Sequence, residues 1–142
     1  NKNKNIKTKM KSEVRLVLVG DAQVGKTSLV LAMYSQTFQE KKIIPVMPKV
    51  SLPPEVSPDN VATHILDTSS RDQDSHILEA EVKKADVVCI VYDVSRPETF
   101  ERVESFWLPR IRLLTQNNSS DTPVILVGNK VDLREEPLSD AE

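Results

Sequence analysis

Apolar residues in this chain are gathered into short uninterrupted runs that alternate with segments compatible with helices. The apolar runs, which have the length and composition of buried strands, cover residues 14–19, 61–66, 87–92 and 124–127. The helix-compatible segments cover residues 28–33, 77–84 and 97–114. Strands that alternate with helices form a parallel sheet covered by helices on both faces, so the pattern predicts an α/β fold with a mostly parallel sheet.

Prolines divide the chain between these segments. Five of them lie between residues 45 and 58, and a stretch so rich in proline excludes a long helix there. Residues 49–52 within it alternate between polar and apolar side chains, which favours a strand at the edge of the sheet. Pro97 suits the first turn of the longest helix, with Ser95 as its N-terminal cap. Pro109 is expected to kink or split that helix.

Composition and charge indicate one folded domain with a tail. With 142 residues, 39% of them hydrophobic, the chain is long enough for one globular domain with a single core. Five of its 19 basic residues lie among the first 11 positions, which leaves 14 basic against 21 acidic residues in the remainder. We therefore expect a basic, low-complexity tail over residues 1–12 and a domain over residues 13–142. The acidic character of that domain argues against binding to nucleic acid.

A phosphate-binding motif follows the first apolar run. Residues 20–27 fit the pattern G-x-x-x-x-G-K-[ST] between a strand and a helix. Its glycines allow successive backbone N–H groups to face one anion, and the helix N-terminus adds partial positive charge. Lys26 can reach the β- and γ-phosphates as a binding and catalytic residue, and the Thr27 hydroxyl can ligate Mg²⁺. The nucleotide-binding residues predicted from this motif are Gly20, Gln23, Val24, Gly25, Lys26, Thr27 and Ser28.

Two further polar segments follow apolar runs in the same way. Gly20, Asp67 and Asn129 each lie just past the carboxyl end of an expected strand. Because the carboxyl ends of parallel strands meet at one edge of the sheet, we expect the three segments to converge there. Asp67 is in the position of the acidic residue that holds Mg²⁺ in P-loop proteins, commonly through water.

The residues after the last apolar run have the form N-K-x-D, which suits guanine. The Asp132 carboxylate can accept from the ring N–H and the exocyclic amine of guanine, whereas adenine has no donor at the corresponding ring position. Asn129 can fix the loop and the base edge, and the stem of Lys130 can cover the ring plane. The motif therefore favours GTP or GDP over ATP, and an ATP-using enzyme is the disfavoured alternative.

Together these motifs resemble those of the Ras-like small GTPases, over residues 13–142. Residues 107–109 and 132–135 are similar to Rho proteins. Residues 10–15, 52–58 and 63–67 more closely resemble the N-terminal GTPase domain of Miro, the atypical mitochondrial Rho-like GTPases. The resemblance implies a P-loop NTPase fold of the small-GTPase type, with its C-terminal part missing. An ordinary Rho, Rac or Rab protein is the alternative.

Some positions depart from the small-GTPase pattern. Val46 stands where relatives carry a threonine that contacts Mg²⁺ and the γ-phosphate. The signature Asp-Thr-Ala-Gly-Gln becomes Asp-Thr-Ser-Ser-Arg at residues 67–71, so that Ser70 replaces a glycine and Arg71 replaces the glutamine that positions the attacking water. We therefore expect slow GTP hydrolysis with retained GTP binding.

Arg71 leaves several interpretations open. A guanidinium cannot orient water as glutamine does, but it can stabilise transition-state charge like an arginine finger supplied in cis. It can also be a solvated or salt-bridged surface residue, and Gln73 is a candidate substitute for the water-positioning glutamine. The resemblance further assigns Ser69 to the nucleotide and the backbone of Pro45 to Mg²⁺.

The resemblance implies a GTP-binding switch that uses GTP or GDP and Mg²⁺ and that binds effector or adaptor proteins at residues 45–48 and 67–76. The alternatives are an ordinary Rho- or Rac-type signalling GTPase and a scaffold domain that holds its nucleotide without switching. A Miro parent would add EF-hand calcium-binding segments, a second GTPase domain and a C-terminal membrane anchor. It would act at the cytosolic face of the mitochondrial outer membrane on mitochondrial transport, distribution and morphology, with any membrane contact made by those additional parts.

Overall fold

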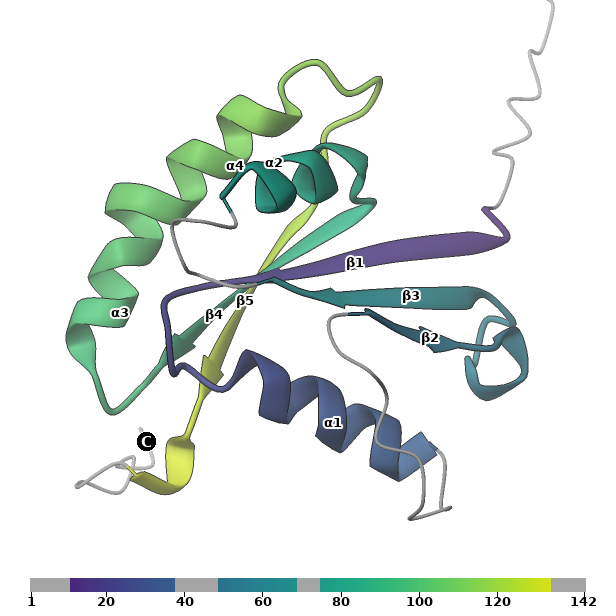
Figure 1. Ribbon diagram of the computed structural model, residues 1–142, viewed down its shortest axis with the longest axis horizontal. Coiled ribbons are helices and arrows are strands. Elements are labelled where there is room, and N and C mark those ends of the chain that lie inside the picture. Colours follow the sequence, from purple (N-terminus) through teal and green to yellow (C-terminus); the bar gives the residue numbers. More distant parts are fainter. Residues whose placement is uncertain (1–10, 38–48, 69–74, 134–142) are drawn as a thin grey trace, which may run out of the picture.

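The structure is a computed structural model, and it describes residues 11–37, 49–68 and 75–133. Strands and helices alternate along these residues (Figure 1). They are β1 (Glu13–Val19), α1 (Lys26–Thr37), β2 (Lys49–Leu52), β3 (Ala62–Asp67), α2 (Ser75–Lys84), β4 (Val87–Asp93), α3 (Pro97–Arg102), α4 (Leu108–Thr115) and β5 (Val124–Asn129). Short 3-10 turns lie at Pro54–Val56 and Val131–Leu133, and a π-helical segment, Val103–Trp107, joins α3 to α4.

The strands form one sheet in the order β2-β3-β1-β4-β5. β1 pairs in parallel with β3 and β4, and β4 pairs in parallel with β5, whereas β2 runs antiparallel to β3 at the edge. The predicted mostly parallel sheet and its edge strand are therefore confirmed. The four parallel strands end at the same edge of the sheet, where the register aligns Leu18 with Asp67 and Asp93 with Asn129.

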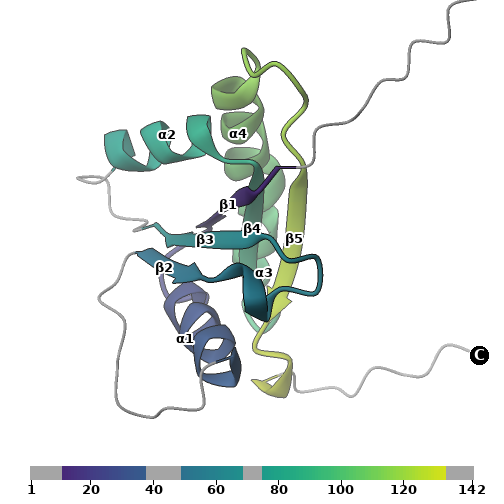
Figure 2. The ribbon, with the colours of Figure 1, turned by 90° about the vertical axis from the view of Figure 1, so that its right-hand side faces the viewer.

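Helices cover both faces of the sheet, as the sequence predicted. α1 lies on one face, and α2, α3 and α4 lie on the other (Figures 1 and 2). Successive strand residues point to opposite faces. Accordingly, Val17 and Ile90 are buried in the core under the three helices, and Leu18 and Cys89 are buried in the core next to α1. Cys89 is a free, buried thiol, and burial raises its pKa.

The long helix expected over residues 97–114 is split in the turn before Pro109. A proline has no N–H, and its ring crowds the carbonyl four residues earlier, which here is that of Ser105 in the π-helical segment. The Leu108 N–H bonds instead to the carbonyl of Val103, five residues back. The predicted cap is wrong, because Arg96 is at the cap position of α3 and the Ser95 hydroxyl donates to a carboxylate, that of Asp93.

We predict that the core under the three helices carries much of the stability, and α4 offers a matched pair to test this. Ile111 is 1% exposed and Leu113 is 63% exposed on the same helix. Ile111→Ala should lower the free energy of unfolding by about 2–5 kcal/mol, because it removes buried methyl groups and leaves a cavity. Leu113→Ala should change it by less than about 0.5 kcal/mol. Equal losses for the two variants in urea unfolding would contradict this packing.

Candidate functional site

The loop at residues 20–25 joins β1 to α1 and turns through two glycines. Gly20 has a φ of +149°, and a Cβ added to it would lie 2.2 Å from the carbonyl oxygen of Val91 in β4. Gly25 has a φ of +97°, and Gln23 between them also has a positive φ, of 63°. Because side chains are disfavoured in this conformation and backbone lies so close, glycine is required at Gly20. α1 has no acidic residue in its first turn, so the partial positive charge of its N-terminus remains uncompensated within the helix.

Lys26 is held inside this loop. The residue is 8% exposed, and its ammonium donates to the carbonyl oxygens of Gly20 and Asp21, both at 2.8 Å. Burial lowers the pKa of Lys26, and the carboxylates of Asp67 and Asp21 offset part of that effect. The loop therefore holds a cation at the N-terminus of α1, and a cation beside a helix N-terminus is an arrangement that suits a phosphate group.

Thr27 and Asp67 meet across the loop. The Thr27 hydroxyl donates to the Asp67 carboxylate, although the two residues are 40 positions apart. The neighbouring Thr68 hydroxyl donates to the Leu18 carbonyl at 2.6 Å and anchors the end of β3 to β1. Hydroxyl and carboxylate oxygens are ligands that Mg²⁺ accepts, so this pair fits the predicted metal site. Within the described residues, no group of three or more His, Cys, Asp or Glu side chains forms a protein-only metal site.

Asn129 and Lys130 bind the same loop from β5. The Asn129 amide donates to the Val24 carbonyl at 2.9 Å, and the Lys130 ammonium donates to the Gln23 carbonyl at 2.6 Å. A Cβ on Gly25 would lie 2.3 Å from the Asn129 amide nitrogen, so the missing side chain makes the first of these contacts possible. Asp132 follows in an exposed position of the 3-10 turn.

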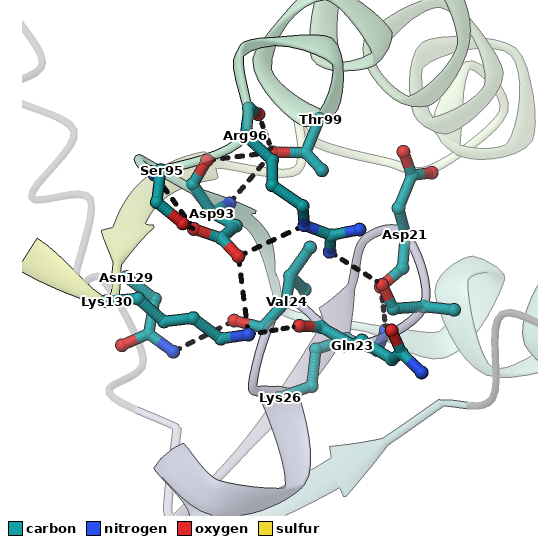
Figure 3. A network of polar contacts seen from close by, with 11 residues as sticks. Asp21, Gln23, Val24, Lys26, Asp93, Ser95, Arg96, Thr99, Asn129 and Lys130 are labelled. Atoms are coloured by element: carbon teal, nitrogen blue, oxygen red, sulfur yellow. Dashed lines mark hydrogen bonds and ion pairs between the residues drawn. The ribbon is translucent and has the colours of Figure 1, made fainter. Parts of the chain in front are cut away.

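Asp93 is a residue of this site that the sequence analysis did not identify. It ends β4 and is 2% exposed. Its carboxylate accepts from the backbone N–H and hydroxyl of Ser95, from Arg96 Nε at 3.1 Å and from Lys130 Nζ at 3.3 Å (Figure 3). Burial opposes its ionisation, but the hydrogen bonds from Ser95, Arg96 and Lys130 together outweigh burial and hold the pKa of Asp93 well below its usual range.

The α3 side of the loop makes three further contacts. Arg96 Nη2 donates to the Ala22 carbonyl at 3.0 Å. The Asp21 carboxylate accepts from Arg102 Nε at 2.9 Å and from the indole N–H of Trp107 at 3.0 Å. Trp107 is buried and lies in the π-helical segment, so this irregular part of the long helix contacts the loop together with α3.

The structure thus brings most of the predicted site residues to one edge of the sheet. Residues 20–27, Asp67, Asn129 and Lys130 lie in contact with one another, whereas Ser28 is exposed in α1. The predicted residues outside the described part of the chain are Pro45, Val46, Ser69, Ser70, Arg71 and Gln73. Asp93 had an available signal, because it ends a buried strand just as Asp67 does.

The fold and this loop define the class of the protein. The chain matches the sequence model of the Ras family over residues 15–142, and it belongs to that family. It is a Ras-like GTPase domain, as the sequence predicted.

Its similarity to particular Ras-like proteins is more specific. It is 46% identical over 132 residues to Mitochondrial Rho GTPase 1 of Mycosarcoma maydis. It is 42% identical over 121 residues to proteins of the same name from two strains of Cryptococcus neoformans var. neoformans serotype D. The resemblance to Miro is thereby confirmed.

The alignments cover most of this chain but little of those relatives. They include 93% of the chain for the first and 85% for the other two, and in each case 17% of the relative. The chain therefore spans about a sixth of the length of the curated relatives it matches. Among the helices of the described residues, none combines the length and apolar character that crossing a bilayer needs.

The surroundings of Asp93 predict a pH dependence of stability. Its pKa in the folded chain is lowered from an unfolded value of about 3.9, so its ionisation stabilises the fold above that pH. Asp93→Asn should lower the free energy of unfolding by about 2 kcal/mol at pH 7. The difference between the variant and the wild type should shrink as the pH falls through 4, where the carboxylate begins to protonate on unfolding.

The measurement is urea unfolding of both proteins between pH 7 and pH 3.5. Asp121→Asn, which alters an exposed carboxylate in the loop before β5, is the matched control and should show no such trend. A difference for Asp93→Asn that stays constant over the whole range would contradict the assignment.

Proposed function

We propose that the domain is a molecular switch that binds GTP and GDP with Mg²⁺ and hydrolyses GTP slowly. One observation carries the proposal: Asn129 and Lys130 of the N-K-x-D segment donate to the Val24 and Gln23 carbonyls of the phosphate loop. A base-recognition loop and a phosphate loop in direct contact suit a ligand that has both a purine and phosphates. The membership of the Ras family supports the same ligand.

Each segment has a distinct role in this proposal. The N–H groups of residues 20–25, Lys26 and the N-terminus of α1 bind the β- and γ-phosphates. Asp132 recognises guanine through its N–H donors. Thr27 and Asp67 hold the metal, with Asp67 acting through water and the Pro45 backbone adding a ligand. Mg²⁺ at this site would neutralise phosphate charge during hydrolysis.

Hydrolysis is proposed to be slow because two side chains of the usual machinery are replaced. Val46 cannot ligate the metal through a hydroxyl, and Arg71 cannot orient water as glutamine does. The cis arginine finger and the solvated surface residue are the alternatives for Arg71, with Gln73 as a substitute for the water-positioning residue. Ser69 is proposed to contact the nucleotide.

The names of the relatives extend the proposal to the whole protein. We propose that residues 13–142 form the nucleotide-binding domain, that residues 1–12 form a basic tail, and that effector or adaptor proteins bind at residues 45–48 and 67–76. The relatives are named mitochondrial Rho GTPases. From the resemblance to Miro we propose that the protein acts at the cytosolic face of the mitochondrial outer membrane, in mitochondrial transport, distribution and morphology. Equal partner binding with GDP and with a nonhydrolysable GTP analogue would favour a non-switching scaffold instead.

The role of Asp132 gives the main test of the function. Wild-type chain should bind GDP more tightly than IDP, which lacks the exocyclic amine, by roughly ten- to a hundredfold, the worth of a hydrogen bond to a charged acceptor. ADP should bind more weakly still. In Asp132→Ala the ratio of GDP to IDP affinity should fall to about one, whereas the exposed control Asp121→Ala should keep the wild-type ratio. Preference of the wild type for ADP in calorimetric titration would sink the proposed function.

The departures at Val46 and Arg71 give a kinetic prediction. In single-turnover assays with GTP and Mg²⁺, hydrolysis should be roughly tenfold or more slower than in an ordinary Rho protein measured alongside, because a positioned water contributes at least that much. Arg71→Gln should raise the rate. A drop in rate would identify Arg71 as a cis arginine finger, and a wild-type rate equal to that of the Rho protein would show that the replaced residues do not limit hydrolysis.

A further inference from the structure

The two carboxylate oxygens of Asp93 have separate partners. Oδ1 accepts from the backbone N–H and the hydroxyl of Ser95, which are contacts within its own turn. Oδ2 accepts from Arg96 Nε at 3.1 Å and lies 3.3 Å from Lys130 Nζ (Figure 3). The Ser95 contacts therefore use only Oδ1. Oδ2 contacts two cations from different parts of the chain, Arg96 and Lys130.

Both cationic side chains also donate hydrogen bonds to the phosphate loop. Lys130 donates to the Gln23 carbonyl at 2.6 Å, and Arg96 Nη2 donates to the adjacent Ala22 carbonyl at 3.0 Å. Because the guanidinium is planar and its donors are fixed in a fork, Arg96 binds the carboxylate and the loop with one rigid group. Asp93 thus lies behind the loop, and two consecutive peptide groups of the loop are tied to it through these side chains.

Removal of the negative charge would disturb both contacts together. The Arg96 and Lys130 side chains are 36% and 30% exposed, and they meet at the buried Asp93 carboxylate. Without that anion two like charges would face each other, and this repulsion is unfavourable even where solvent screens part of it. Asn at this position keeps an oxygen for Ser95 but presents an amide N–H₂ or a neutral oxygen to Lys130 and Arg96. The substitution therefore weakens the Oδ2 contacts selectively and leaves the local turn in place.

We propose that Asp93 is a positioning residue for nucleotide binding, which holds Lys130 and Arg96 on the phosphate loop and thereby slows the release of guanine nucleotide. The inference rests on the proposed function, because it concerns how tightly the same site retains its ligand. Asp93 does not touch the nucleotide in this account. It acts only through Arg96 and Lys130. Its effect on nucleotide release should therefore disappear when both of these side chains are removed, whereas the effect of a residue needed merely for folding should remain.

The test is the dissociation rate of tritium-labelled GDP from the full chain, chased with excess unlabelled GDP in the presence of Mg²⁺. Asp93→Asn should release GDP roughly tenfold faster than the wild type, as expected from the loss of charge-assisted hydrogen bonds. In the background Arg96→Ala/Lys130→Ala, where both intermediaries are gone, Asp93→Asn should change the rate by less than about twofold. A tenfold effect that persists in that background would overturn the proposal in favour of a local structural role.

A milder variant keeps the proposal testable if Asp93→Asn folds poorly. Arg96→Lys retains the charge but cannot bind Asp93 and Ala22 with one planar group, so it should speed release by a few-fold. Arg112→Lys, on an exposed position of α4, is the matched control and should release GDP at the wild-type rate. A wild-type rate for Arg96→Lys would also overturn the proposal.

The outcomes separate this inference from the proposed function. If the wild-type chain binds no labelled GDP, both are wrong. If the wild type binds GDP and the Asp93 and Arg96 variants release it at the wild-type rate, only the positioning role is wrong.

Discussion

The phosphate loop keeps its shape because five consecutive backbone carbonyls, those of residues 20–24, each accept a hydrogen bond from a side chain. The donors are Lys26, Arg96, Lys130 and Asn129, which come from α1, the turn before α3 and the end of β5. In a planar trans peptide the next N–H points away from the carbonyl, so donors that hold the carbonyls also direct the N–H groups of residues 21–25 to the opposite side. The proposed anion site therefore depends on distant parts of the sheet as much as on the glycines of the loop.

Much of this arrangement could be predicted from the sequence. The apolar runs predicted the strands and the parallel direction of the sheet, because strands buried on both faces have little polar character. The run that forms β5 is apolar too, although this edge strand is partly exposed. The shared direction then placed Gly20, Asp67 and Asn129 at one edge, and the observed contacts of Thr27 with Asp67 and of Asn129 with Val24 follow from that placement. The placement of these three residues required only the direction of the strands. The alternation of apolar runs with helix-compatible segments along the chain is enough to predict that direction.

Other features depend on where a single side chain points, and local pattern does not determine that. Ser95 was expected to cap a helix, but its hydroxyl donates to Asp93, since a short polar side chain binds whichever acceptor the folded chain brings near. The contacts of Arg96 with the loop and of Trp107 with Asp21 join residues more than 70 positions apart, with no spacing that marks them in advance. Asp93 could have been identified by its place at the end of a strand, but its two cationic partners could not.

Trp107 has one more consequence, which follows from its being the only tryptophan of the chain. Its indole N–H donates to Asp21 inside the loop, and the ring of Phe106 packs edge-on against it with centroids 5.0 Å apart. Because indole emission is sensitive to hydrogen bonding and polarity, rearrangement of this loop would alter the intrinsic fluorescence of the domain. The fluorescence of Trp107 can therefore report on this loop without an attached dye, and no second indole in this chain contributes to the signal.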